Sequence, residues 1–196
     1  MGEPLANLDR LLPALELACD AGGLGISARR ITISTVGLPK AIHRLCDNRP
    51  WYQLAVSLHA PDDHLRNELV PASKNISLQS ILDAADRYLE VSGRRLTFEY
   101  VLLAGVNDRT SHAHGLVRLL GRRTALVNVI PYNPVAGLPY RTPSSGTLAR
   151  FRDVLEAGGM TVKVRQRKGD KIDAACGQLR RVPLEAETPG RDRGCI

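Results

Sequence analysis

The feature of this sequence that most constrains its fold is a regular alternation of strand-like and helix-like segments. Segments rich in β-branched and apolar residues predict five strands, at residues 30–35, 53–58, 96–102, 125–130 and 161–165. Segments with apolar residues at helical spacing lie between and before them, at residues 8–20, 39–45, 62–69, 78–92, 108–120 and 148–157. Strands that alternate with helices form parallel β-α-β units, in a doubly wound sheet or in a barrel. A closed eight-stranded barrel takes about 250 residues, so we expect an α/β fold that is an open sheet or a partial (β/α) barrel.

Polar side chains mark several helix ends in this pattern. Asn7, Ser77 and Asp108 precede apolar periodic segments, and side chains of these types accept hydrogen bonds from the first amide groups of a helix. Gly93 follows the segment that Ser77 opens, where a glycine can adopt the left-handed conformation that ends a helix. We therefore expect these three helices to begin at those caps.

Charge and composition limit the classes of partner and compartment. The chain has 196 residues and a formal net charge of +7, which favours a polyanionic partner such as nucleic acid, although a merely basic protein would look the same. No long uncharged apolar run and no signal-peptide pattern are present, so we expect no membrane association and a cytoplasmic location. Four cysteines without a secretion signal predict free thiols.

Polar residues recur where the predicted strands end. Ser34, Ser57 with His59, Asn107 and Asn133 all come at or shortly after a strand. Because the carboxyl ends of parallel strands meet at one edge of a sheet, where ligands bind in such folds, we expect these residues to share one rim. For any one of them alone, a role as a helix cap or loop residue is the simpler interpretation.

Cys176 is the candidate nucleophile. It follows a basic stretch that contains Arg165, Arg167, Lys168 and Lys171. Nearby cations favour the thiolate, which is the nucleophilic form of cysteine. The alternative is a buried structural cysteine after a basic turn.

Other chemistries lack their signatures. No G-x-G-x-x-G or G-x-x-x-x-G-K-[ST] motif stands between a strand and a helix, so the sequence does not support a dinucleotide site or a P-loop. His112 and His114 are two residues apart on a predicted helix and do not share a face, and Cys19 and Cys46 have no partner at metal-ligand spacing. We therefore expect no metal ligands in this chain.

Eight segments, in order, resemble the radical S-adenosylmethionine (SAM) RNA methyltransferases that methylate C2 of adenine in 23S ribosomal RNA and in some transfer RNAs. The segments are M-G-E-P-L at Met1, R-R-I-T-I-S-T at Arg29, S-L-H-A-P-D-D at Ser57, E-Y-V-L-L at Glu99, V-N-D at Val106, H-A-H at His112, I-P-Y-N-P at Ile130 and G-D-x-I-D-A-A-C-G-Q-L at Gly169. The resemblance spans residues 1 to about 180 and implies a partial barrel of the radical SAM type.

The resemblance also implies roles for individual residues. Gly2 and Glu3 would contact the amino-acid end of SAM, and its pocket would be completed by Ser34, Ser57, Leu58, His59 and Asn133. Cys176 would accept a methyl group from one SAM molecule, and a 5′-deoxyadenosyl radical from a second would abstract hydrogen from that methyl group. The resulting carbon radical would add to the adenine ring. The basic segments would bind RNA phosphates.

The chain departs from the family in one respect. The family binds a 4Fe-4S cluster through a C-x-x-x-C-x-x-C loop, and this sequence has no such triplet. We therefore expect residues 1–180 to be the C-terminal part of a radical SAM core, truncated at its N-terminal side, and residues 181–196 to be a disordered basic tail. Such a chain would be monomeric and inactive alone.

Three alternatives remain open at this point. The chain could be a cluster-less remnant that binds SAM or RNA without catalysis. It could derive from the related subfamily that methylates adenine at C8. It could also be a non-functional fragment with open sheet edges, which would favour aggregation.

Overall fold

The structure of the protein is a computed structural model, which describes residues 2–49, 51–121, 123–135 and 137–165. Cys176 and the predicted tail at residues 181–196 lie outside the described residues.

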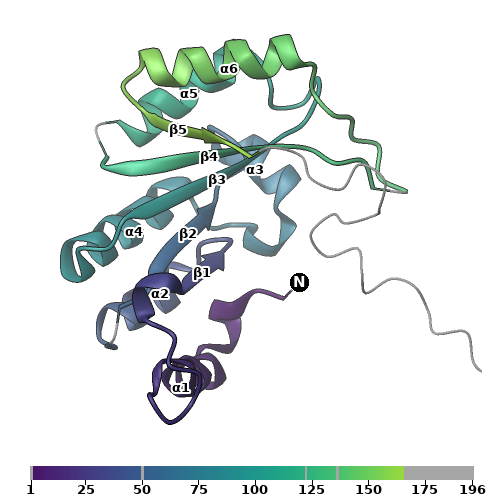
Figure 1. The fold of residues 1–196 in the computed structure, drawn as a ribbon. Helices are drawn as coiled ribbons and strands as arrows, with labels where there is room; N and C mark the ends of the chain where they lie inside the picture. The colour runs from purple at the N-terminus through teal and green to yellow at the C-terminus, as the bar shows by residue number, and fades with distance from the viewer. Residues whose placement is uncertain (1, 50, 122, 136, 166–196) are drawn as a thin grey trace, which may run out of the picture.

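The described residues form one parallel sheet whose strands follow each other in sequence order. The strands are β1 (Thr32–Thr35), β2 (Gln53–Ser57), β3 (Leu96–Leu102), β4 (Ala125–Pro131) and β5 (Thr161–Val164), and each pairs in parallel with the next (Figure 1). A doubly wound sheet reverses its strand order at a switch point. The unbroken order β1-β2-β3-β4-β5 is instead the winding of a partial (β/α) barrel, one of the two architectures that the sequence predicts.

Helices connect the strands and cover one side of the sheet (Figure 1). The α-helices are α1 (Leu8–Cys19), α2 (Pro39–Cys46), α3 (Asp63–Leu69), α4 (Leu78–Ser92), α5 (Thr110–Leu120) and α6 (Ser145–Ala157). Short 3-10 turns lie at Pro4–Asn7, Ala28–Arg30 and Pro71–Ser73. None of the helices among the described residues is long and apolar enough to span a membrane.

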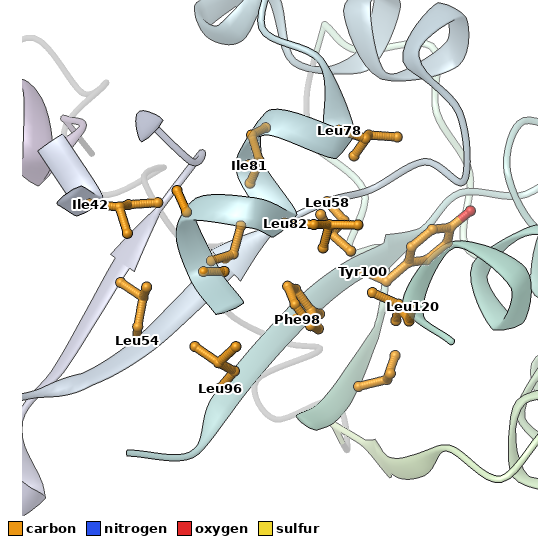
Figure 2. Close-up of a cluster of buried hydrophobic side chains, with 14 of the residues drawn as sticks. Ile42, Leu54, Leu58, Leu78, Ile81, Leu82, Leu96, Phe98, Tyr100 and Leu120 are labelled. Carbon is orange, nitrogen blue, oxygen red and sulfur yellow. The ribbon is translucent and has the colours of Figure 1, made fainter. Parts of the chain in front are cut away.

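The hydrophobic core lies between the sheet and this helical layer. Alternate residues of β3 are buried, and Phe98 and Tyr100 point from the strand toward the helices (Figure 2). Ile81 and Leu82 of α4 meet them and are fully buried. Burying such side chains stabilises the fold by about 1.5–3 kcal/mol each. This packing makes the sheet a rigid base for the loops at its carboxyl edge.

The predicted helix ends are partly confirmed. Ser77 caps α4 by accepting a hydrogen bond from Ser80 N, and Gly93 ends α4 with φ of 59°. The prediction for Asp108 is wrong, because its carboxylate accepts a hydrogen bond from Gly105 N at 3.0 Å and α5 begins only at Thr110. Asn7 precedes α1 as predicted, but its side chain makes no capping hydrogen bond.

The first strand is shorter than predicted. Residues 28–30 form a 3-10 turn, and the strand begins at Thr32 instead of residue 30.

Candidate functional site

The carboxyl ends of β1, β2 and β4 bring the polar residues singled out in the sequence to one edge of the sheet. Ser34 lies exposed in β1, Ser57 is the last residue of β2, and Asn133 follows the end of β4 by two residues. Neighbouring strands lie about 4.8 Å apart, so β2 and β4, with β3 between them, are about 10 Å apart. A ligand of nucleoside size can bridge this distance.

Glu3 attaches the N-terminal segment to the end of β1. One carboxylate oxygen accepts hydrogen bonds from Leu5 N at 3.0 Å and from the Thr35 hydroxyl at 2.6 Å, and the other accepts one from Val36 N at 2.8 Å. Two carboxylate oxygens offer about four acceptor positions, so one remains for a ligand. Glu3 therefore holds the segment that carries Gly2 at the rim.

Ser57 and Leu58 differ in what they can offer a ligand. Ser57 is half-buried and its hydroxyl is on the side of β2 opposite the core. Leu58 is 1% exposed, its side chain belongs to the hydrophobic core, and its backbone N–H donates to Glu99 O at 2.9 Å. A ligand contact from Leu58 would therefore use its backbone.

His59 is held in one orientation and one protonation state. Its φ is 62°, a left-handed conformation that is uncommon outside glycine, and its ring Nδ1 accepts a hydrogen bond from Val101 N at 3.0 Å. Burial, and to a smaller extent the nearby Arg66 charge, lower the pKa of the His59 imidazole to about 4. The ring is therefore neutral near pH 7, and because Nδ1 accepts, the proton is on Nε2. The Nε2–H is then the ring's remaining donor.

Asn107, expected at the rim, is a structural residue beneath it. It is 0% exposed. Its amide nitrogen donates to His59 O at 2.9 Å and to Val101 O at 2.8 Å, and its amide oxygen accepts from Leu103 N at 2.7 Å. These bonds occupy both donors, so Asn107 fixes the backbone of His59 and does not face a ligand.

Arg66 is the residue that sequence reasoning missed. Its side chain in α3 is 0% exposed, and its guanidinium donates to the backbone oxygens of Val36 and Ser57. It thus connects Val36, the residue after β1, with Ser57, the last residue of β2. An arginine in a seven-residue helix gives no periodic signal, so its burial could not be predicted.

The described thiols are poor candidates for nucleophiles or metal ligands. Cys46 donates a hydrogen bond to Ile42 O, and burial raises the pKa of the Cys46 thiol, which disfavours the thiolate. Cys19 and Cys46 are half-buried free cysteines on helices. Among the residues that the structure describes, no group of three or more His, Cys, Asp or Glu side chains could hold a metal ion. The thiol assignment for Cys176 lies outside these residues.

Known proteins resemble this chain over most of its length, although no family model matches it. It is 63% identical over 181 residues to a Rhodopirellula baltica protein named "Probable dual-specificity RNA methyltransferase RlmN". A radical SAM methyltransferase from Sphaerobacter thermophilus, whose crystal structure is known, is 43% identical and superposes with a TM-score of 0.87 over 91% of this chain. The chain is thus similar, over most of its own length, to about half of each of these two methyltransferases.

The radical SAM fold extends to more distant structures. A domain of pyruvate-formate lyase-activating enzyme from Bacteroides vulgatus superposes with a TM-score of 0.64 at 19% identity, over 85% of this chain and 96% of that domain. Streptococcus suis SuiB, solved with bound S-adenosylmethionine, superposes with a TM-score of 0.61 at 17% identity, over 84% of this chain and 38% of SuiB. At these identities the likeness shows the fold alone, and it agrees with the predicted partial barrel.

The chain spans about half the length of these two relatives. The alignment covers 92% of this chain but 49% of the Rhodopirellula protein, and 52% of the Sphaerobacter chain.

Proposed function

We propose that this chain forms the SAM-binding half of an RNA methyltransferase, with the SAM site at the carboxyl ends of β1 to β4. The observation that carries the proposal is the convergence of Glu3, Ser34 and the Ser57–His59 segment on one rim of a radical SAM fold. Glu3 and Gly2 would bind the amino-acid end of SAM. Asn133 would close the site from β4.

The chemistry of these residues fits SAM. The methionine end of SAM carries an ammonium group, which can donate hydrogen bonds to a carboxylate such as that of Glu3. It also carries a carboxylate, which can accept a hydrogen bond from a neutral donor such as the His59 Nε2–H. The low pKa of His59 keeps this donor neutral near pH 7 and adds no charge beside the sulfonium of SAM. Arg66 would orient the site from below through Val36 and Ser57.

The residues of this chain do not fit the 4Fe-4S cluster of the family. The sequence contains no C-x-x-x-C-x-x-C segment, and the described residues include no group of metal ligands. We therefore assign no step that passes through a cluster to the residues of this chain.

Cys176 is the proposed methyl carrier. SAM supplies a methyl group bonded to a positively charged sulfur, which a thiolate can attack. The Cys176 sulfur would form a bond to the methyl carbon while the bond from that carbon to the sulfonium breaks, releasing S-adenosylhomocysteine. The cations at Arg165, Arg167, Lys168 and Lys171 would favour the Cys176 thiolate.

The proposed acceptor is C2 of adenine in 23S ribosomal RNA and transfer RNA, in the cytoplasm. The name of the Rhodopirellula relative supports an RNA substrate, and the net charge of +7 supports binding to phosphates. C2 of adenine is not nucleophilic, so a methyl group must reach it through an activated carrier, which is the role proposed for Cys176.

A chimera tests this function. The 181 residues of this chain that align with the Rhodopirellula protein would replace the matching region of that protein, and RNA exposed anaerobically to the chimera and SAM would be digested and analysed for 2-methyladenosine. We expect methylation by the chimera, its loss in Cys176→Ala, and its retention in the control Cys46→Ala. Methylation that persists in Cys176→Ala would contradict the methyl-carrier role. A chimera that folds but leaves RNA unmodified, while the Rhodopirellula protein modifies it, would contradict the proposed function.

A further inference from the structure

The loops that enter the strands meet at the edge of the sheet opposite the proposed SAM rim, and none of the roles above uses this amino edge (Figure 1). The loops that enter β1 to β4 are residues 20–31, 47–52, 93–95 and 121–124. Their acidic residues are Asp20 and Asp47. Their described basic residues are Arg29, Arg30, Arg49, Arg94, Arg95 and Arg123. The amino edge is therefore strongly basic.

The loops at the carboxyl edge do not share this charge. Those that lead from β1 to β4 to the next helix are residues 36–38, 58–62, 103–109 and 132–144. Their carboxylates and cations balance, and these residues are Asp62, Asp108, Arg109 and Arg141. Among the loops around β1 to β4, positive charge is thus concentrated at the edge away from the SAM site, where it attracts a polyanion.

Hydrogen bonds between neighbouring loops hold the amino edge in one arrangement. The side chain of Gln53, the first residue of β2, donates to Arg29 O at 2.6 Å and so attaches the loop before β1. The side chain of Arg94 donates from Nε to Trp51 O at 3.2 Å and so joins the loops before β2 and β3. The loops before these three strands therefore form one continuous surface.

Three arginines of this surface have side chains that the fold does not use. Arg29, Arg30 and Arg95 are exposed, and no hydrogen bond or ion pair joins their guanidinium groups to another described residue. Arg123 differs, because its guanidinium pairs with Asp86 of α4 at 2.9 Å. A guanidinium has five N–H donors in a planar fork that matches the geometry of a phosphate.

Arg49 is held in place by an aromatic ring within the same surface. Its guanidinium carbon lies 4.2 Å from the centroid of the Trp51 ring. Trp51 is half-buried, and its indole N–H donates to Cys46 O at 3.4 Å, which fixes the ring. Stacking uses the face of the guanidinium and leaves the N–H groups at its edge for an acceptor. Arg49 is thus oriented before a ligand binds, which lowers the entropic cost of binding.

The spacing of the arginines suits a chain of phosphates. Arg30, Arg49 and Arg95 precede three neighbouring strands, which are about 4.8 Å apart, so the row extends over about 10 Å. Successive phosphates of a nucleic-acid backbone can contact such a row, and each contact releases counterions and adds affinity.

An anionic membrane is the competing partner. Leu24 and Ile26 are exposed apolar residues in the loop before β1, and a membrane-binding surface combines cations with apolar side chains. Exposed large apolar residues occur in this one loop of the three, whereas arginine occurs in all three. This distribution favours a nucleic acid.

The amino edge is too far from the rim to bind the nucleotide that is modified there. Strand β3 has seven residues with a rise of about 3.3 Å each, so the two edges are about 20 Å apart. RNA at the amino edge therefore contributes a segment other than the one that carries the target base.

We propose that Arg29, Arg30, Arg49 and Arg95 form an anchoring surface for the phosphate backbone of a folded RNA, on the opposite edge of the sheet from the SAM site. Contacts to phosphates carry no base information, so this surface adds affinity and not sequence selectivity. The inference rests on the proposed function for the identity of its partner, which is the RNA substrate.

Tryptophan fluorescence tests the location of this surface without any variant. Trp51 is the only tryptophan of the chain, so its emission reports on the amino edge. Titration of the 196-residue chain with a labelled RNA hairpin should change the Trp51 emission with the same saturation curve as the anisotropy of the label. S-adenosylhomocysteine, bound about 20 Å away, should leave the emission unchanged. Hairpin binding that leaves the Trp51 emission unchanged would overturn the proposed location.

A double variant tests the arginines themselves. Arg30→Gln with Arg95→Gln should bind the hairpin more than about tenfold more weakly at about 0.1 M salt. The slope of log affinity against log salt concentration should fall by about 1.4–1.8, because each phosphate contact contributes about 0.7–0.9. The control double variant, Arg10→Gln with Arg150→Gln, makes the same change in net charge at exposed positions of α1 and α6 and should alter both quantities little. Both double variants should bind S-adenosylhomocysteine as wild type does.

The outcomes separate this surface from the proposed function. If the two double variants lose equal affinity for the hairpin, net charge alone is responsible and the anchoring surface is wrong. If phosphatidylserine vesicles change the Trp51 emission and the hairpin does not, the partner is a membrane and the proposal is wrong. In both cases binding of S-adenosylhomocysteine by wild type leaves the proposed SAM site standing, whereas its absence would contradict that site and not the RNA measurements.

Discussion

Replacement of Asn107 by alanine should cost a large part of the stability of the chain. The substitution leaves three backbone groups without their present partner: the buried N–H of Leu103 and the partly buried oxygens of His59 and Val101. Each buried unsatisfied group costs about 1–3 kcal/mol. Since the site can relax in part, we expect a loss of about 3–5 kcal/mol in the free energy of unfolding, out of the 5–15 kcal/mol typical of a domain.

Urea denaturation of the 196-residue chain, followed by circular dichroism, measures this loss. The slope of the transition should stay the same while its midpoint falls. Asn48→Ala is the matched control, because Asn48 is half-buried and its side chain donates a hydrogen bond only to Arg44 O among the described residues, and it should cost less than about 1 kcal/mol. A loss below about 1 kcal/mol for Asn107→Ala would refute the argument, because water or other side chains would then satisfy those three groups.

Two further predictions concern the rim. At Gly37, with φ of 87°, a Cβ would lie 2.6 Å from Ile81 Cγ2, so Gly37→Ala should destabilise the chain by about 3 kcal/mol in a urea titration. Gly25→Ala, at φ of 60° with open space around it, should cost about 1–2 kcal/mol, and equal losses at the two positions would contradict the packing argument. The pKa of His59 falls from 6.5 to about 4 on folding, so between these pH values the unfolded chain binds more protons than the folded one. Its contribution to stability is therefore complete above pH 6.5 and declines by about 3 kcal/mol as pH falls to 4. Asparagine tolerates the left-handed backbone of position 59, so His59→Asn should flatten this pH dependence in urea titrations across that range. The control His64→Asn, at an exposed position, should leave it unchanged. If the free energy of unfolding of His59→Asn depends on pH as steeply as that of wild type, another group is responsible.

The sequence was sufficient to predict elements whose signals are local. The strand at residues 96–102 has the predicted bounds, and Ser77 and Gly93 delimit α4 as their intrinsic preferences require. The prediction that Asp108 begins a helix is wrong because a carboxylate near a turn can accept a hydrogen bond from more than one amide, and here it accepts one from Gly105 N. Which amide it chooses depends on the path of the loop, which propensity does not specify.

The candidate site could be predicted in part. Parallel alternation alone places Ser34, Ser57 and Asn133 at the same edge of the sheet, because strand ends share an edge whatever the side chains do. The burial of a polar residue, by contrast, depends on parts of the chain that are distant in sequence. Arg66 and Asn107 are of types that usually lie at the surface, and only the completed fold shows that backbone groups surround them.

The distinction between an open sheet and a partial barrel also required the structure. Both windings use the same β-α alternation, and they differ only in which strands become neighbours. The observed order β1-β2-β3-β4-β5 resolves this, and it places Glu99 of β3 beside Ser57 of β2.

The central claim is that the rim at the carboxyl ends of β1 to β4 binds SAM. Titration of the isotopically labelled 196-residue chain with S-adenosylhomocysteine, monitored by backbone amide NMR shifts, tests it most directly. The account predicts saturable shifts at Val36, Ser57, His59 and Asn133, and no shifts on the outer surface of α4 and α6. Absence of binding, or shifts that map to the helical layer while the rim stays unchanged, would contradict the claim.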